Sequence, residues 1–299
     1  MKSESRSIHV LCNGTLQAAA YVESDPSPQQ DRPTVLMLHG FMGTKHNWRF
    51  LIELLSPEFH CISLDLLGFG DSGKPDMRYD IATEVDFVQQ VVKALNLQQF
   101  YIFGHSFGGW VASAYALKYP QAVLGLVLAA PAGIRDETMC VRYRHLRYLL
   151  WPTPLVDVAL NMSKPLATAA GKQIQLATAI SYRQLLNSVP AVRSFLVDRL
   201  RPEDLIDTVE QEIHRLQIPT LVMIGSRDEI FPLWHAQTYA ERIPKATLHI
   251  LPNASHALLK NHYQDMLEPI LNFMKLAQPE YESPPYPMPA LSAIANPPV

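Results

Sequence analysis

The chain has 299 residues, of which 48% are hydrophobic and 18% charged, and its formal net charge is −3. A chain of this length and apolar content can bury a large core, and a single α/β domain of this size is common. Because no basic excess is available to neutralise phosphates, the composition excludes nucleic acid as an expected partner.

Cysteine usage and the start of the chain indicate a cytoplasmic protein. The three cysteines cannot all pair, and no Cys/His spacing typical of a metal site is present, so we expect free thiols and no metal. The start of the chain is polar, and no apolar run of about 18 residues follows anywhere. The sequence therefore predicts no signal peptide and no transmembrane segment.

The first half of the chain alternates predicted strands with predicted helices. Asn13-Gly14 separates two apolar runs and suits the tight turn of a hairpin. Thr34–Leu38 is a short continuous apolar run, typical of a buried parallel strand. Similar strands are expected at 61–64, 100–103 and Val123–Ala129, with helices near 48–55, 85–95 and 110–119 between and after them. Thr83-x-x-Asp86 resembles a capping box at the start of the second helix. The alternation predicts a mostly parallel, doubly wound sheet covered on both faces.

The alternation stops at residue 133 and resumes near residue 216. Residues 133–215 contain helical patches and several prolines but no convincing strand, so they are predicted to form a helical cap inserted into the core. The core is assigned to 1–132 and 216–277, with strands at 220–224 and 247–251 and a last helix at Tyr263–Leu276. Residues 278–299 are Pro-rich and are expected to form a tail.

A glycine-flanked serine carries the strongest chemical signal. Gly104-His105-Ser106-Phe107-Gly108-Gly109 lies directly between a predicted strand and a predicted helix. A serine on such a sharp turn needs small neighbours, and the turn lifts its hydroxyl clear of the sheet. The following helix start offers free N–H groups to a developing oxyanion. Ser106 is therefore the candidate nucleophile.

A base and an acid are expected at the same edge of the sheet. A serine hydroxyl needs a general base, and His256 follows the last predicted strand. Asp228 follows the strand before it, so both side chains should lie at strand carboxyl ends, as Ser106 does. His256 is the candidate base and Asp228 the acid that orients it.

Other candidates for these two roles are weighed by position. His105 lies inside the sharp turn, where its side chain is expected to leave the site, and His39 is expected to brace a neighbouring loop. Asp136 or Glu137 could replace Asp228, since they follow the strand that ends near Ala129. The residues nearest that strand are not acidic, which favours Asp228.

The loop His39-Gly40-Phe41-Met42-Gly43 is predicted to complete an oxyanion hole. It follows the strand Thr34–Leu38 and should face the serine turn. The backbone N–H of Phe41 and that of Phe107 would then donate to one oxyanion. Because the donors are backbone groups, the loop conformation matters more than the side chains.

The motifs together resemble the α/β-hydrolase superfamily, from about Thr34 to Leu276. The order Ser, Asp, His is the order used by this fold. More narrowly, they resemble the branch of carboxylesterases, C–C hydrolases of meta-cleavage products, haloperoxidase-like enzymes and epoxide hydrolases. The segments that carry the resemblance are His39-Gly40-Phe41, Asp65-Leu66-Leu67-Gly68-Phe69-Gly70-Asp71-Ser72, the serine turn, Gly225-Ser226-Arg227-Asp228 and Ser255-His256.

The resemblance narrows the chemistry further. Ser106 stands where the epoxide hydrolases and haloalkane dehalogenases of this superfamily use aspartate, which excludes both activities. His105 stands where C–C hydrolases commonly carry asparagine. The expected function is therefore hydrolysis of a carboxylic ester or similar acyl bond through an acyl-enzyme, with no cofactor.

The substrate is expected to be a small-molecule apolar ester, with a medium or long acyl chain or a terpenoid or aromatic group, held between the serine turn and the cap. Apolar candidates for this pocket are Met42, Trp110, Leu146, Leu149, Leu150 and Trp151, although each could simply pack in the core. The cationic stretch 142–147 beside the last four suggests a solvated helix face or a peripheral membrane contact.

Two other classes of function use the same residues. A small-molecule receptor with an intact triad would bind its ligand tightly and turn it over slowly. An acyltransferase, C–C hydrolase or lyase would direct the same triad to another acceptor or bond. Fold alone does not separate these alternatives from an esterase.

Overall fold

The computed structural model describes residues 4–24, 32–138, 149, 151, 153–197 and 207–277. The tail predicted at 278–299 lies outside the described residues. No helix in the described ranges has both the length and the apolar character needed to cross a membrane.

The described strands form one eight-stranded sheet in the order β1-β2-β4-β3-β5-β6-β7-β8. β1 and β2 pair antiparallel around Asn13-Gly14, where both residues have positive φ, as the hairpin prediction requires. β2 also pairs antiparallel with β4, and every later pair is parallel. The strands are β1 Glu4–Cys12, β2 Thr15–Glu23, β3 Thr34–Leu38, β4 His60–Leu64, β5 Phe100–His105, β6 Val123–Ala129, β7 Thr220–Gly225 and β8 Ala246–Leu251.

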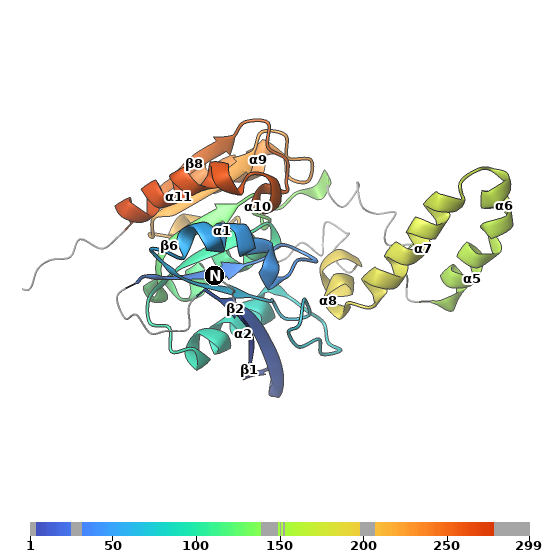
Figure 1. Ribbon diagram of the computed structural model, residues 1–299, viewed down its shortest axis with the longest axis horizontal. Coiled ribbons are helices and arrows are strands. Elements are labelled where there is room, and N and C mark those ends of the chain that lie inside the picture. Colours follow the sequence, from blue (N-terminus) through green and yellow to red (C-terminus); the bar gives the residue numbers. More distant parts are fainter. Residues whose placement is uncertain are drawn as a thin grey trace, which may run out of the picture.

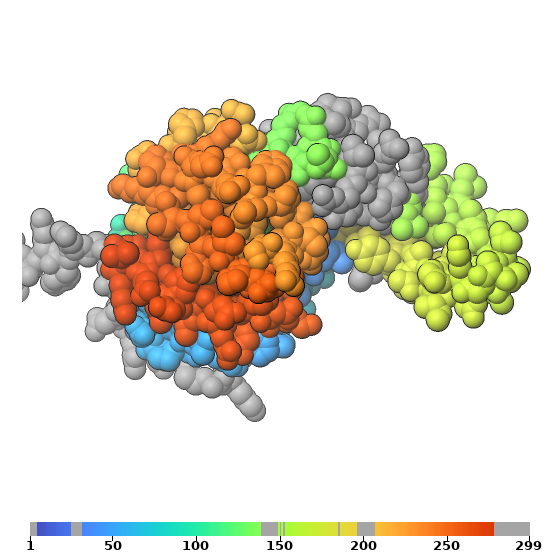
Figure 2. All heavy atoms as spheres, turned by 90° about the horizontal axis from the view of Figure 1, so that it is seen from above, coloured from blue at the N-terminus to red at the C-terminus, as the bar shows by residue number. Residues whose placement is uncertain are grey.

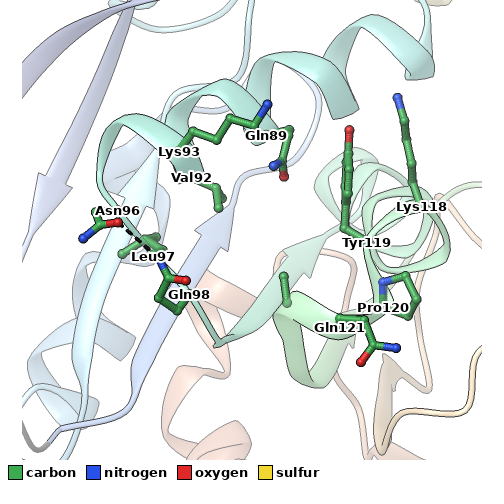
Figure 3. Close-up of a pocket in the computed structure, with 11 residues that line it drawn as sticks. Gln89, Val92, Lys93, Asn96, Leu97, Gln98, Lys118, Tyr119, Pro120 and Gln121 are labelled. Carbon is green, nitrogen blue, oxygen red and sulfur yellow. Dashed lines mark hydrogen bonds between the residues drawn. The ribbon is translucent and has the colours of Figure 1, made fainter.

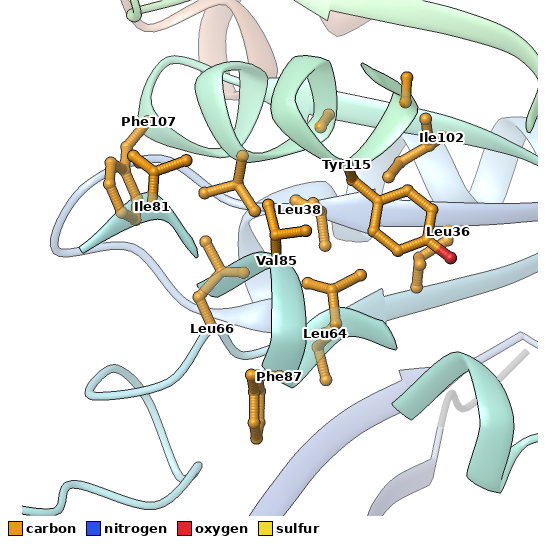
Figure 4. Close-up of a cluster of buried hydrophobic side chains, with 14 of the residues drawn as sticks. Leu36, Leu38, Leu64, Leu66, Ile81, Val85, Phe87, Ile102, Phe107 and Tyr115 are labelled. Atoms are coloured by element: carbon orange, nitrogen blue, oxygen red, sulfur yellow. The ribbon is translucent and has the colours of Figure 1, made fainter. Parts of the chain in front are cut away.

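Helices cover both faces of this sheet (Figure 1). Successive strand residues point to opposite faces, so Leu36 and Leu38 pack with one buried cluster and Val35 and Met37 with another. α2, α3 and α9 contribute to the first cluster, which Figure 4 shows between α3 and the sheet, and α1, α10 and α11 contribute to the second. Their bounds are α1 Arg49–Leu55, α2 Ile81–Ala94, α3 Phe107–Lys118, α9 Leu233–Arg242, α10 Leu258–Asn261 and α11 Tyr263–Leu276, with short turns η1 Lys45–Trp48, η2 Pro120–Ala122 and η5 Ile213–Arg215.

The predicted start of α2 is wrong by several residues. Asp80, not Thr83, is the N-cap, and its side chain accepts a hydrogen bond of 2.8 Å from the Thr83 N–H. An aspartate in extended conformation caps a free N–H as well as a threonine does, and the residues after it already face the core. Ile81 and Glu84 are consequently buried.

The stretch predicted as a cap contains helices and no strand within its described residues. They are α5 Pro154–Met162, α6 Lys164–Ala169, α7 Gln173–Asn187, α8 Pro190–Val192 and the π-helical turn η3 Arg193–Val197, besides η5. α5, α6 and α7 pack on one another and extend away from the sheet (Figures 1 and 2); we refer to these three helices as the arm. The boundaries 133 and 215 of a separate cap domain stay a prediction.

The chain returns from the arm to the core through α8 and η3. The Tyr79 N–H donates to the Ser194 hydroxyl at 2.9 Å, and the Ile81 N–H donates to the Asp207 carboxylate at 3.1 Å. The Trp110 indole N–H donates to the Asp207 carbonyl at 3.0 Å. η3 and Asp207 are therefore both tied to the region around α2 and α3, beside the serine turn.

Candidate active site

Ser106 lies on a strained turn between β5 and α3. Its φ is 53°, a left-handed value that a residue with a side chain rarely adopts. Its N–H donates to the Ala129 carbonyl of β6 at 2.9 Å, which holds the turn on the sheet. This geometry matches the strand–turn–helix context that the sequence motif predicts.

The glycines on either side of Ser106 are required by backbone contacts. A Cβ atom at Gly104 would overlap the Gly108 carbonyl, and one at Gly108 would overlap the Leu38 carbonyl of β3. Because these neighbours are backbone atoms, neither contact can be relieved by a side-chain rotation. The small residues therefore allow α3 to begin directly against β3 and β5.

His256 and Asp228 are brought to Ser106 from two other strands. His256 Nε2 lies 3.1 Å from Ser106 Oγ, and His256 Nδ1 lies 2.8 Å from Asp228 Oδ2. Asp228 follows β7 and His256 follows β8, so all three residues stand at the carboxyl ends of parallel strands. Since a carboxylate can only accept, Nδ1 carries the proton and Nε2 is left to accept from the serine hydroxyl.

The Asp228 carboxylate is fixed by its own loop. Its side chain is buried, and Oδ1 accepts from the N–H groups of Ile230 and Phe231 at 2.8 and 2.9 Å. The Phe231 ring also packs edge-on against the His256 ring, with centroids 5.4 Å apart. The Asp228 carboxylate is thus held by two backbone N–H groups, and the His256 ring is held by the Phe231 ring.

Asp136, the alternative acid, pairs with a different histidine. His235 Nε2, on α9, lies 3.1 Å from Asp136 Oδ2, and both side chains are buried. Burial lowers the pKa of His235. Burial alone would raise the pKa of Asp136, but hydrogen bonds from Thr138 and His235 outweigh it and the pKa is lowered. Glu137 is exposed and forms an ion pair with Arg135. Neither Asp136 nor Glu137 contacts His256.

The sequence analysis expected the His105 side chain to point away from the active site, but in the structure it lies beside His256. Its ring is buried behind His256, with Nε2 3.1 Å from the His256 carbonyl and ring centroids 5.1 Å apart. Burial, together with the neighbouring His256, lowers the pKa of His105 to about 4. A neutral His105 adds no positive charge beside His256.

His39 braces the loop that follows β3. Its Nε2 accepts from the Leu66 N–H at 3.0 Å, so Nδ1 carries the proton and donates to the Gly40 carbonyl at 2.7 Å. Burial lowers the pKa of His39, which keeps this tautomer neutral. Gly40 packs so closely that a Cβ atom there would lie 3.2 Å from Ser106 Cβ. The loop and the serine turn are therefore in direct contact.

Phe41 and Phe107, the predicted oxyanion donors, lie in adjoining backbone segments. Phe107 is the first residue of α3, where helical N–H groups have no intrahelical acceptor. The two rings pack edge-on with centroids 6.1 Å apart. Phe69 and Phe195, which the sequence analysis missed, add rings 5.9 and 4.6 Å from the Phe107 ring. The only sequence signal for Phe69 was its place in the segment 65–72.

The predicted pocket residues fall into three groups. Met42 and Trp110 are partly buried beside the main core, and the Trp110 ring lies 6.4 Å from the Phe107 ring. Leu149 and Trp151 belong to the base of the arm, where Arg183 donates to both of their carbonyls. The Trp151 side chain is 60% exposed, and no hydrogen bond or ring contact joins it to Ser106 or His256. Leu146 and Leu150 lie outside the described residues.

Two surface cavities differ in their relation to these residues. One, of about 650 Å³, is bordered by His256 and His105 and by side chains of η1, α1 and α10. The other, of about 480 Å³, lies between the end of α2 and η2 (Figure 3). Residues such as Gln98 and Gln121 place the second at the amino ends of β5 and β6, opposite Ser106. In the described ranges no group of three His, Cys, Asp or Glu side chains could hold a metal ion.

Comparisons with known proteins agree with this architecture. Monoacylglycerol lipase ABHD6 from Mus musculus is 25% identical over 256 residues, which cover 81% of this chain and 76% of the relative. A putative lipase (lip1) from Acinetobacter baumannii AYE superposes with a TM-score of 0.68 at 21% identity, covering 92% of both chains.

A third match is the solved structure of a hydrolase with a different kind of substrate in its name. The meta-cleavage product hydrolase CumD from Pseudomonas fluorescens IP01 superposes with a TM-score of 0.65 at 22% identity, covering 91% of this chain and 98% of that one. At this identity the structural matches show the fold alone. The family model of the alpha/beta hydrolase fold matches residues 33–188, from just before β3 to just after α7, and the chain belongs to this family.

Proposed function

We propose that this protein is a serine hydrolase that cleaves a carboxylic ester through an acyl-enzyme, with Ser106 as nucleophile. The observation that carries the proposal is the continuous series Ser106 Oγ–His256 Nε2 at 3.1 Å and His256 Nδ1–Asp228 Oδ2 at 2.8 Å. The proton position that Asp228 imposes on the imidazole is the one that a general base for serine requires.

In the acylation step, Ser106 Oγ attacks the ester carbonyl and His256 Nε2 takes its proton. The buried Asp228 carboxylate stabilises the imidazolium that forms. The imidazolium then gives the proton to the leaving alcohol as the tetrahedral intermediate collapses. The acyl group remains as an ester of Ser106.

In the second step, water attacks the acyl-enzyme while His256 accepts a proton from it. The intermediate oxyanion of both steps is held by the N–H groups of Phe41 and Phe107. Loss of one such donor typically raises the barrier by about 2.7–4 kcal/mol. The close contact of Gly40 with Ser106 keeps the Phe41 loop against the nucleophile.

The proposed substrate is an apolar acyl ester, such as an ester of a medium or long fatty acid. Four aromatic rings surround the ring of Phe107, the residue that follows Ser106, and supply apolar surface near the nucleophile. By its name the mouse relative is a monoacylglycerol lipase, and this supports the same substrate class.

A panel of p-nitrophenyl esters of increasing acyl length tests the proposal. Wild-type protein should hydrolyse the esters with a preference for longer chains, and Ser106→Ala should have no activity and no labelling by a fluorophosphonate. Since Ser106 is at a turn on the rim of the sheet, Ser106→Ala should unfold at the same temperature as wild type. Labelling or hydrolysis that persists in Ser106→Ala would refute the assignment.

A further inference from the structure

The outer helices of the arm carry apolar side chains that no other described residue covers. No residue of α5 or α6 is buried, although their sequences are PLVDVALNM and KPLATA. Leu155 is 72% exposed, Met162 76%, Leu166 74%, and Ile174 at the start of α7 is 75% exposed. Isolated exposed apolar residues are ordinary, but a group of this size on one projection marks an interaction surface.

The spacing of these residues separates two faces of α5. Val156 and Leu160 are half-buried and four residues apart, as expected for the face that packs on the other helices of the arm. Leu155, Val158 and Met162 recur at intervals of three and four and are all exposed, so they form a second face. The packing of the arm uses one face and leaves the other unpartnered among the described residues.

The arm is basic, whereas the whole chain is acidic. The arm, residues 154–187, contains one acidic residue, Asp157, which forms an ion pair of 2.8 Å with Arg183. The same residues contain three basic ones, Lys164, Lys172 and Arg183, in a chain whose net charge is −3. Lys164 and Lys172 are exposed and lie two positions before Leu166 and Ile174. The exposed apolar residues are therefore accompanied by two lysines that form no ion pair with another described residue.

The chain connects the arm directly to the region of Ser106. The arm projects away from the rest of the molecule (Figures 1 and 2), while α8 and η3 continue from α7 back to the serine turn. There the Phe195 ring packs on the Phe107 ring with centroids 4.6 Å apart. A single stretch of chain thus joins the exposed face to the residue that follows Ser106.

We propose that the exposed apolar residues of the arm, Leu155, Val158, Met162, Leu166 and Ile174, dock on an anionic lipid surface. Leu155, Met162 and Leu166 enter the acyl region, and Lys164 and Lys172 contact the anionic headgroups. A rigid protein partner would need a groove that matches the projecting helices in shape. A lipid surface needs no such groove, because its acyl region adapts to apolar side chains. Two arms facing each other would bring like charges together, which disfavours a second copy as the occupant. The proposal rests on the proposed function for its purpose, which is delivery of an apolar ester from the lipid.

Vesicle flotation tests the docking. Full-length protein should float with vesicles of phosphatidylcholine and phosphatidylglycerol, and less well with phosphatidylcholine alone. The double variant Leu155→Glu/Met162→Glu should bind about tenfold more weakly or worse, because two apolar side chains no longer leave water. The matched control is Leu16→Glu on β2, a leucine that is 70% exposed and lies on the sheet instead of the arm; it should bind as wild type does.

A charge variant gives an independent readout. Lys164→Glu/Lys172→Glu keeps the apolar face and should lose the preference for anionic vesicles, and added salt should weaken wild-type binding. Every variant should hydrolyse a short soluble ester at the wild-type rate, which shows that it is folded. If Leu155→Glu/Met162→Glu does not hydrolyse the short ester, the vesicle binding of Lys164→Glu/Lys172→Glu tests the proposal instead.

Three results would overturn the proposal. The first is wild-type protein that does not bind anionic vesicles, and the second is an apolar variant that binds them as tightly as wild type does. The third is a wild-type dimer, in sedimentation equilibrium, that Leu155→Glu/Met162→Glu converts to a monomer while vesicles remain unbound; the face would then join two copies. Ser106→Ala separates the two proposals, because it should abolish hydrolysis and still float.

Discussion

The Nε2 atom of His105 lies 3.1 Å from the carbonyl oxygen of His256, so one histidine supports the backbone of the other from behind. Because a carbonyl only accepts, Nε2 of His105 carries the proton. The other nitrogen, Nδ1, is buried without a partner and faces Gly40, where a Cβ atom would lie 2.9 Å from it. A second proton on this ring would therefore be buried with no acceptor.

This relationship predicts a loss of stability in acid. The pKa of His105 is about 4 in the folded protein because of burial and the neighbouring His256, against 6.5 for its ordinary value. Below pH 6.5 the unfolded chain takes up a proton that the folded protein refuses until about pH 4. The stabilisation is thus complete above pH 6.5 and is lost as the pH falls to about 4, amounting to about 3 kcal/mol.

Urea unfolding at pH 7 and pH 4.5 measures this effect. His105→Gln keeps a donor for the His256 carbonyl but cannot titrate, so its free energy of unfolding should fall by about 2–3 kcal/mol less than that of wild type. His9→Gln removes an exposed histidine and serves as the control, with a fall equal to that of wild type. Equal falls in all three proteins would show that the pKa of His105 in the folded protein is not lowered.

The two aspartates should respond differently to the same amide substitution. Asp228→Asn keeps the size of the side chain but can favour the wrong tautomer of His256, so kcat should drop by about 10⁴-fold with little change in fold. Asp136→Asn weakens a buried pair with His235 that is not joined to His256. It should cost about 1–3 kcal/mol of stability and leave kcat near that of wild type.

Steady-state kinetics and thermal unfolding of the same samples check both halves of this prediction. A crippling Asp136→Asn together with a mild Asp228→Asn would move the acid to the loop after β6. A large loss of kcat in both variants would mean that the His235 pair holds the shape of the site.

Much of the sheet could be predicted because its strands have a simple signature. Buried parallel strands such as Thr34–Leu38 and Val123–Ala129 are continuous apolar runs, and their bounds match the structure. The loop positions of Ser106, Asp228 and His256 follow directly, since parallel strands end at one edge. Helix starts were predicted less well, as for α2, because an N-cap aspartate several residues upstream gives no periodic signal.

Side-chain partners made across the fold could not be predicted. The pairing of Asp136 with His235 joins residues 99 positions apart, and neither lies in a recognisable motif. Phe195 reaches Phe107 only because the chain folds back from the arm. Trp151 was expected in the pocket for its apolar ring, but its exposure depends on how the arm projects. Such contacts are set by tertiary geometry, which a local pattern does not contain.

Phe195 should influence the choice of acyl chain. Its ring fills space against the Phe107 ring and lies 6.4 Å from the Tyr79 ring. Phe195→Ala opens this space beside Ser106, so kcat/KM should rise for longer or branched p-nitrophenyl esters relative to acetate. Tyr119→Ala removes a ring from a tyrosine pair at the opposite edge of the sheet and should leave the preference unchanged. An unchanged preference in Phe195→Ala would place the acyl chain elsewhere.

Gly40→Ala should separate catalysis from folding. The added Cβ would lie 2.9 Å from His105 Nδ1 and 3.2 Å from Ser106 Cβ, so the loop carrying Phe41 must shift by a few tenths of an ångström or more. The backbone at Gly40 has no positive φ, so the substitution brings no backbone strain of its own.

A displaced oxyanion donor affects the transition state and hardly affects the bound ester, so kcat of Gly40→Ala should fall about 10²-fold while KM changes little. Fluorophosphonate labelling should slow in parallel, because its addition to Ser106 also develops charge on oxygen. A rise in KM at constant kcat would instead show that Gly40 borders the substrate pocket and that the Phe41 N–H is not an oxyanion donor.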